Sequence, residues 1–171
     1  MIHTISLLVE NHQGVLARIS TLFSGRGYNL ESLTVGVTTD PTVSRITLVC
    51  GGDDAVIEQI KKQLNRLVDV IKVIDLTELP AVKRELALVK VSAKHNRRGE
   101  ILQVADVFGS RVMDVGSDCI VLEITGSSEK IDDFLSILQP YSMQEVARSG
   151  LVAIERGKKS KKPAAYVAGQ R

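Results

Sequence analysis

The sequence predicts an α+β protein made of two consecutive units of one design, each an antiparallel sheet with two helices on one face. The first observation concerns residues 1–78, where apolar residues alternate with period two in four stretches and recur every three or four residues in two others, in the order βαββαβ. The second is that residues 85–155 repeat this order in a shorter form. Such an order is typical of the ferredoxin-like fold, whose split βαβ halves place both helices on the same side of the sheet.

The elements of the first unit follow from its hydrophobic periods. Residues 4–9 alternate as a strand, and the next stretch predicts a helix that begins near Gly14 and ends at Gly27, because glycine accepts the left-handed conformation of a helix C-cap. Strands are expected at 30–38 and 45–50, and a second helix and a β-branched strand complete the unit. The sheet face without helices would expose apolar surface, which predicts association with another sheet or chain.

The boundary between the units is expected at Pro80, because proline cannot donate to a strand ladder and its neighbours turn polar. Residues 79–84 are therefore predicted to be a linker and residues 85–155 the second unit, with its last strand at 146–154. Residues 156–171 contain six Lys and Arg and no acidic residue, so they are predicted to form a disordered, basic tail. The rest of the chain then has a net charge of −4, against +2 for the whole sequence.

The two units show an approximate internal repeat. When Gly14 is laid on Gly99, the apolar stripe of the first helix falls on apolar residues of the third, with Leu16 on Ile101. The same offset of 85 residues lays Leu22 on Val107. This alignment predicts that the two helices bury equivalent positions.

Composition limits the class of protein. The chain has 171 residues, of which 44% are hydrophobic, enough to bury a core. It has two cysteines, each in an apolar strand pattern without another metal-ligating residue at suitable spacing. Neither a signal peptide nor an apolar run of the ~18 residues needed to span a bilayer is found. A cytoplasmic location without membrane association is therefore expected.

The loops around the first helix have the groups needed to hold a small amphoteric ligand. First-turn N–H groups at Gly14 and Val15 have no partner within the helix, and with the positive end of the helix dipole they favour a carboxylate. Asn29, after the helix, offers a carbonyl oxygen that can accept a hydrogen bond from an ammonium. Asn11 suits an N-cap or a turn. A turn with a helix cap explains the same residues without a ligand, and both interpretations stay open on these residues alone.

Other functional classes find little support. The sequence contains no nucleophile elbow, phosphate-binding loop, His-x-x-x-His pair or Cys-x-x-Cys, so neither catalytic residues nor a metal site is predicted. His12, the one histidine near the candidate pocket, is interpreted as a surface residue of a polar loop. The βαββαβ order also occurs in RNA-recognition modules, which stack bases on strand aromatics. All three phenylalanines here fall on helical stripes, so nucleic-acid binding is not expected.

Four runs of the chain carry a resemblance to a known family. The longest is residues 8–35, in which Arg26-Gly-Tyr-Asn-Leu-Glu-Ser-Leu-Thr is the most specific part. The others are Asp40-Pro-Thr-Val-Ser-Arg-Ile-Thr, Gln63-Leu-Asn-Arg-Leu-Val-Asp-Val and Glu145-Val-Ala-Arg-Ser-Gly. Together they resemble the regulatory (small) subunit of acetolactate synthase, also called acetohydroxyacid synthase. The likeness covers nearly the whole chain except the basic tail.

The resemblance implies an N-terminal ACT domain at 1–78 and a C-terminal ACT-like domain. It implies a homodimer, joined through the ACT domain, that binds valine between the protomers. The implied effector site comprises Asn11, Gly14, Val15 and Leu16 of one protomer, with Asn29, Leu30 and Val35 of its partner.

The implied function is regulatory and belongs to branched-chain amino acid biosynthesis, which makes valine, leucine and isoleucine. The chain would bind a large catalytic subunit, raise its activity and transmit valine as feedback inhibition. Thiamine diphosphate, Mg²⁺ and FAD are expected in that partner, and no cofactor is expected in this chain. A stand-alone ACT amino-acid sensor for another enzyme or regulator is the alternative. For a DNA-binding regulator, however, no helix-turn-helix pattern is left over.

Overall fold

The computed structural model describes residues 1–93 and 97–157, so most of the predicted tail, residues 158–171, lies outside the described residues. The first unit consists of β1 (Ile2–Glu10), α1 (Val15–Ser24), β2 (Leu30–Val37), β3 (Val43–Gly51), α2 (Asp54–Leu64) and β4 (Val70–Asp75). The second consists of β5 (Ala81–Ser92), α3 (Arg98–Phe108), β6 (Arg111–Val115), β7 (Cys119–Gly126), α4 (Ser128–Leu138), β8 (Met143–Arg148) and β9 (Val152–Glu155).

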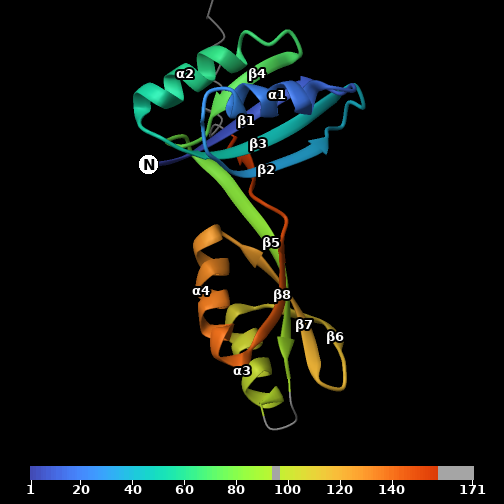
Figure 1. Cartoon of the computed structure of the whole chain (residues 1–171). Coiled ribbons are helices and arrows are strands. Elements are labelled where there is room, and N and C mark those ends of the chain that lie inside the picture. The colour runs from blue at the N-terminus through green and yellow to red at the C-terminus, as the bar shows by residue number, and fades with distance from the viewer. Residues whose placement is uncertain (94–96, 158–171) are drawn as a thin grey trace, which may run out of the picture.

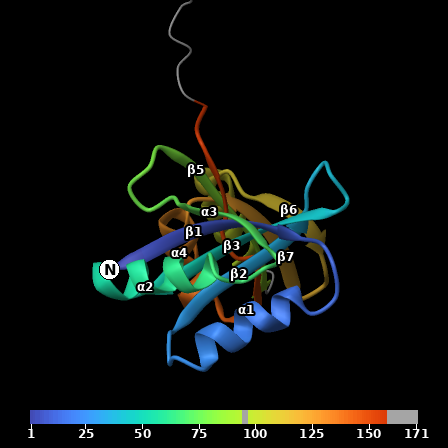
Figure 2. The same cartoon turned by 90° about the horizontal axis from the view of Figure 1, so that it is seen from above.

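The two sheets have the same topology. Their strand orders are β2-β3-β1-β4 and β6-β7-β5-β8, and neighbouring strands are antiparallel. The two units follow one another along the molecule, and the second lies on the side of the first sheet that faces away from α1 and α2 (Figure 1). Figure 2 views the first unit in front of the second. The predicted α+β fold of two ferredoxin-like units is confirmed.

Each unit has its own core between its helices and its sheet. In the first unit Ile5, Leu7 and Val9 of β1 are at most 1% exposed and pack under the two helices, as the alternation predicted. In the second unit Ala87, Val89 and Val91 of β5 are fully buried in the same way, and so is Phe134 of α4, which packs against Phe108. Among the described residues, no helix is long and apolar enough to cross a membrane.

Helix α1 begins and ends where predicted, but its N-cap is a different residue. At its end, Gly27 adopts φ 67°, and its N–H donates to the carbonyl of Ser24 while the N–H of Tyr28 donates to that of Phe23. These two bonds form a Schellman motif, and the edge-to-face contact of Tyr28 with Phe23 supplies its apolar contact. The N-cap is Gly14, at φ 89° and without a side-chain cap, so of the two roles suggested for Asn11, N-cap or turn residue, the N-cap is wrong.

Two expectations about the second unit need correction. Ala81–Arg84, expected within a linker, form the first part of β5, because β9 supplies them with a hydrogen-bonding partner. The single last strand expected at 146–154 is two strands, β8 and β9, separated by a crossover at Ser149–Leu151. β5 therefore pairs with β9 through its first residues and with β7 and β8 through the rest.

The internal repeat is offset by one residue from the alignment that the sequence suggested. α1 buries Val15 and Ile19, and α3 buries Ile101 and Ala105, which corresponds to an offset of 86. Leu16 is 43% exposed instead, so it is not equivalent to the buried Ile101. Offsets of 85 and 86 residues both align apolar residues of α1 with apolar residues of α3. The sequence alone therefore does not distinguish the two offsets, and the packing of the helices does.

The crossover between β8 and β9 attaches the second unit to the first. The N–H of Leu151 donates to Ser32 Oγ (3.3 Å), and Thr34 Oγ1 donates to the carbonyl of Ser149 (3.4 Å). Gly150 lies directly over these two β2 side chains with φ 78°. A Cβ atom at Gly150 would lie 2.6 Å from Ser32 Oγ and 2.7 Å from Thr34 Oγ1, so only glycine fits there without displacement.

An ion pair between the buried Glu85 and the exposed Arg148 connects three elements of the second unit. Glu85 of β5 is 6% exposed and accepts two hydrogen bonds from Arg148 of β8, from Nε at 2.7 Å and from Nη2 at 2.9 Å. Ser128 Oγ, at the start of α4, donates a third (3.1 Å). The bonds from Arg148, followed by its charge, outweigh burial and lower the pKa of the Glu85 carboxyl below its ordinary value.

Gly150→Ala should destabilise the protein more than Gly109→Ala does. Both glycines have positive φ, but a Cβ at Gly109 meets nothing within 4 Å. Gly109→Ala therefore measures the backbone strain alone, about 1–2 kcal/mol. Gly150→Ala should add the loss of the two bonds to β2, about 1 kcal/mol each. Urea unfolding followed by far-UV circular dichroism measures both, and equal losses would mean that the close approach is unimportant.

Lowering the pH should reduce the free energy of unfolding of the wild type more than that of the Glu85→Gln variant. Because the folded-state pKa of Glu85 is lowered, its ionised form stabilises the fold above the unfolded-state pKa. That contribution disappears as the pH falls through the folded-state pKa. At pH 6 the variant should be less stable by about 1–3 kcal/mol, since it loses a charge-assisted pair. Urea midpoints measured between pH 6 and 3 should fall less steeply for the variant, and parallel slopes would contradict this assignment.

Candidate functional site

The loop before α1 is fixed to the turn between β2 and β3 by Asn11. Its backbone N–H donates to the carbonyl of Thr42 (2.7 Å), and its side-chain Nδ2 donates to the carbonyl of Pro41 (2.9 Å). Ser44 Oγ in turn donates to Asn11 Oδ1 (3.0 Å). The Asn11 side chain therefore positions the loop and has its amide groups engaged within the protein.

Backbone donors at the start of α1 are free for a ligand. In the part of the chain that the structure describes, the N–H groups of Gly14, Val15 and Leu16 have no hydrogen-bond acceptor. No side-chain bulk lies nearby, since a Cβ at Gly14 would meet nothing within 4 Å. These groups and the helix dipole form a preorganised anion-binding surface of the kind that holds a carboxylate.

Asp69, in the turn before β4, fixes the same loop a second time. Its role was not predicted from the sequence. This carboxylate is 4% exposed, and it accepts from Arg18 Nη1 of α1 at 2.6 Å and lies 3.1 Å from His12 Nε2. The carbonyl of Asp69 also accepts the N–H of Glu10 (2.9 Å). One sequence feature could have identified Asp69: it is a lone acidic residue within the apolar run Leu67-Val-Asp-Val-Ile, and such a pattern indicates a buried charge with fixed partners.

His12 is a surface residue, as predicted, with its side chain 45% exposed, and it also contacts two acidic side chains. Its Nδ1 faces the carbonyl of Gln13 (3.0 Å), and its Nε2 faces the carboxylates of Asp69 and, at 3.3 Å, Glu10. Both ring nitrogens then face acceptors, which favours the doubly protonated ring. The Gln13 carbonyl, and then the nearby acidic groups, raise the pKa of His12 above its usual value. Glu10, His12 and Asp69 also bring three ligand-type groups within 4.8 Å of one another.

The other predicted site residues lie away from this loop. Asn29 and Leu30 follow the end of α1, and a helix of ten residues is about 15 Å long. Within one protomer, Gly14 and Asn29 therefore sit at opposite ends of α1 and do not form one pocket. Asn29 is exposed, and Val35 on β2 is 44% exposed.

These residues lie beside an open sheet edge. β2 is the edge strand of the first sheet, so one side of its backbone has no ladder partner. Val35 and Val37 on this strand, at 44% and 61% exposure, add apolar surface, and Leu16 of α1 is exposed as well. Edge strand and apolar patch together form a surface suited to pairing with a second chain.

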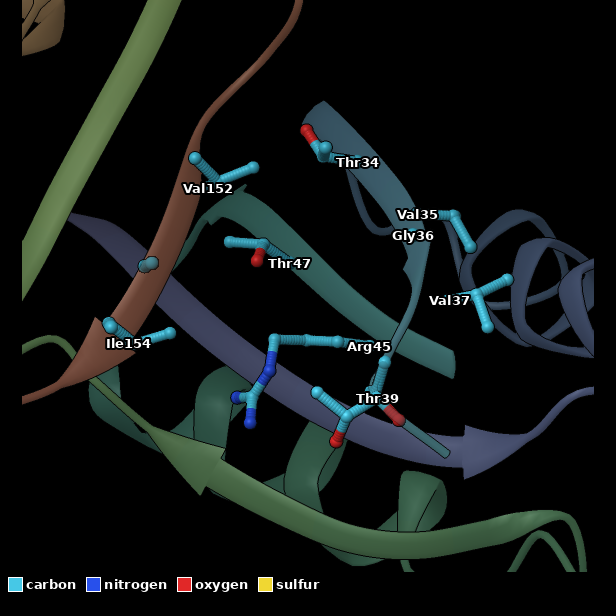
Figure 3. A pocket seen from close by; sticks show the side chains of 11 residues that line it. Thr34, Val35, Gly36, Val37, Thr39, Arg45, Thr47, Val152 and Ile154 are labelled. Carbon is cyan, nitrogen blue, oxygen red and sulfur yellow. The ribbon is translucent and has the colours of Figure 1, made fainter. Parts of the chain in front are cut away.

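A cavity of about 390 Å³ lies on the opposite face of β2, between the first sheet and β9. Figure 3 shows Val152 and Ile154 extending from β9 toward the sheet, whereas Val35 and Val37 point away. Of the predicted effector residues only Val35 borders this cavity, and its side chain does not enter it. The cavity is thus distinct from the loop at Gly14.

Comparisons with known proteins agree with one another. Residues 5–72 match the family model of the AHAS small subunit-like ACT domain, and residues 84–157 match that of the small subunit of acetolactate synthase. The chain is 48% identical over 159 residues to a probable acetolactate synthase small subunit of Archaeoglobus fulgidus, covering 93% of this chain and 99% of that protein. It is 46% identical over 155 residues to the acetolactate synthase small subunit of Mycolicibacterium smegmatis, covering 91% of each.

A solved structure supports the same conclusion. The acetolactate synthase small subunit of Thermotoga maritima superposes with a TM-score of 0.84 at 38% identity, over 92% of this chain and 99% of that one. Fold, family models and relatives all point in one direction, and the likeness extends across both units. The chain therefore belongs to the family of small, regulatory subunits of acetolactate synthase.

Proposed function

We propose that the chain binds valine between two protomers and thereby controls the activity of a catalytic large subunit. The observation that carries this proposal is the set of free N–H groups at Gly14 to Leu16, at the end of a loop fixed from two sides. They suit the carboxylate, and a carbonyl oxygen at Asn29 suits the ammonium. Aliphatic neighbours such as Leu30 and Val35 suit the valine side chain.

The separation of Gly14 from Asn29 along α1 supports a site formed by two chains. A two-fold axis beside β2 would pair the open edges of two sheets and bring the Gly14 loop of one protomer to Asn29 of its partner. The same contact would cover the exposed Leu16, Val35 and Val37. We therefore propose an isologous homodimer through the ACT domain, with two equivalent effector sites.

Regulation then requires that valine binds the two states of the holoenzyme with different affinity. A coupling of about 1–3 kcal/mol is ordinary for such control. The large subunit, with thiamine diphosphate, Mg²⁺ and FAD, is expected to carry out the reaction, while this chain activates it and relays valine occupancy. A stand-alone amino-acid sensor would instead bind valine without affecting a large subunit.

Valine titrated calorimetrically into the purified chain should give saturable heat that Gly14→Asp abolishes. The aspartate places negative charge where the carboxylate of valine should dock, and the space at Gly14 is otherwise open. Gly14→Asn is the matched control, because its amide has nearly the same shape without the charge and asparagine also tolerates positive φ. We expect Gly14→Asn to bind valine more tightly than Gly14→Asp by about tenfold or more.

Acetolactate formation by the reconstituted holoenzyme tests the regulatory part. Wild type and Gly14→Asp should both activate the large subunit, and valine should inhibit only the wild-type complex. Activation without any valine response of the wild type would refute the effector site. Valine binding without activation would favour the stand-alone sensor.

Valine affinity should decrease as the pH rises through the folded-state pKa of His12. This pKa is raised, so the bonds of the protonated ring stabilise the loop below the unfolded-state pKa and are lost at higher pH. His12→Gln keeps a polar side chain and should remove this dependence. Calorimetric titration at pH 6 and 8 measures it, and an equal pH response in the variant would assign the effect to another group.

A further inference from the structure

The face of the first sheet opposite its helices bears an unusual set of side chains. Hydroxyl-bearing residues occupy neighbouring positions across three strands, with Thr34 of β2 beside Thr47 of β3 and Thr47 beside Ser6 of β1. The cavity of about 390 Å³ lies over this face, and its volume is within the range of small-molecule sites. Thr38 and Thr39, at the end of β2, also line it.

Arg45 of β3 is the charged residue of this cavity. Its Nη1 donates to Ser6 Oγ (2.8 Å), and no carboxylate within the described residues lies at ion-pair distance. A guanidinium has five N–H donors, so most of them are available. In Figure 3 its side chain runs across the sheet toward the space between Thr39 and Ile154.

The opposite wall of the cavity is aliphatic. Val152 and Ile154 point from β9 toward the sheet, yet they are 49% and 54% exposed because the space before them is empty. Hydroxyls of Thr39 and Thr47 point to no acceptor among the described residues. No acidic residue lines the cavity, and the nearby Asp40 uses its Oδ1 on Thr42 in its own turn.

We propose that this cavity binds a short aliphatic carboxylate without an ammonium group, and specifically a 2-oxo acid. The carboxylate would pair with Arg45, the oxo group would accept from the threonine hydroxyls, and the carbon chain would cover Val152 and Ile154. An amino acid fits less well, because its ammonium would lie beside a guanidinium with no carboxylate to receive it. The site lies where β9 of the second unit meets β2, so its ligand would contact both units.

A pair of probes with the same carbon skeleton tests the proposal. Calorimetric titration of the full chain with 3-methyl-2-oxobutanoate and with L-valine should be done on the Gly14→Asp background, which blocks the proposed valine site but leaves the cavity intact. The oxo acid should bind and valine should not. Arg45→Met should weaken oxo-acid binding by about tenfold or more, and Arg45→Lys should restore part of it.

A second variant tests the cavity independently, in case Arg45→Met does not fold. Val152→Asp places a carboxylate on the cavity wall and should also weaken oxo-acid binding. Val146→Asp on β8 is its matched control, since Val146 is similarly exposed, at 40%, but does not border the cavity. Far-UV circular dichroism checks that each variant is folded.

The outcomes separate this proposal from the valine site. Binding that depends on Arg45 and Val152 but not on Gly14 or Val146 supports the cavity. Absence of oxo-acid binding to the wild type up to about 10 mM overturns the proposal. Binding lost in Gly14→Asp, or unchanged in both cavity variants, overturns it as well, whatever valine does in the wild type.

Discussion

The close approach of the β8–β9 crossover to β2 is the constraint on which the arrangement of the two units depends. Backbone passes directly over two hydroxyl side chains, Ser32 and Thr34, and bonds to both. That distance is possible because Gly150 has no side chain and adopts a positive φ. Once the chain has crossed there, β9 pairs with the start of β5 and lies over the helix-free face of the first sheet. The cavity on that face lies between the sheet and β9, with threonine and arginine side chains on one wall and aliphatic side chains on the other.

β2 contacts the crossover of the second unit through some of its side chains, and we place a second protomer beside its open edge. Its edge bears Leu30 and Val35, which we place in the effector site between protomers, while the side chains of Ser32 and Thr34 hold the second unit. Side chains of a strand alternate between its faces, which separates Val35 from Thr34, and a register shift between Leu30 and Ser32 lets Leu30 pack against the core of the first unit. The proposed effector residues and the residues that hold the second unit are therefore interleaved along one short element. A change at the edge that alters the twist of β2 would act directly on the crossover. Coupling of this kind requires that ligand occupancy shifts the balance between two arrangements of that contact.

The local signals of the first unit were sufficient to locate its loop and helix. Gly27 closes α1 because its sequence context already specifies a Schellman motif, and β1 faces its core as the alternation requires. Expectations failed where a partner distant in sequence decided the outcome. Ala81–Arg84 became a strand through β9, more than 65 residues later. The burial of Asp69 depends on Arg18 and His12, which lie about 50 residues earlier.

The sequence by itself determined the order of elements in the first unit, the two-unit fold and the family, because these rest on local periodicity, turn residues and specific runs such as 26–34. Tertiary structure alone decided which residues meet. It separated Gly14 from Asn29 by the length of α1, so that one protomer does not complete the effector site that we propose, and it placed Arg45 opposite Val152 in a shared cavity. The physical reason is that periodicity fixes which face of an element is buried, whereas the partner of that face depends on chain crossings that local sequence does not encode.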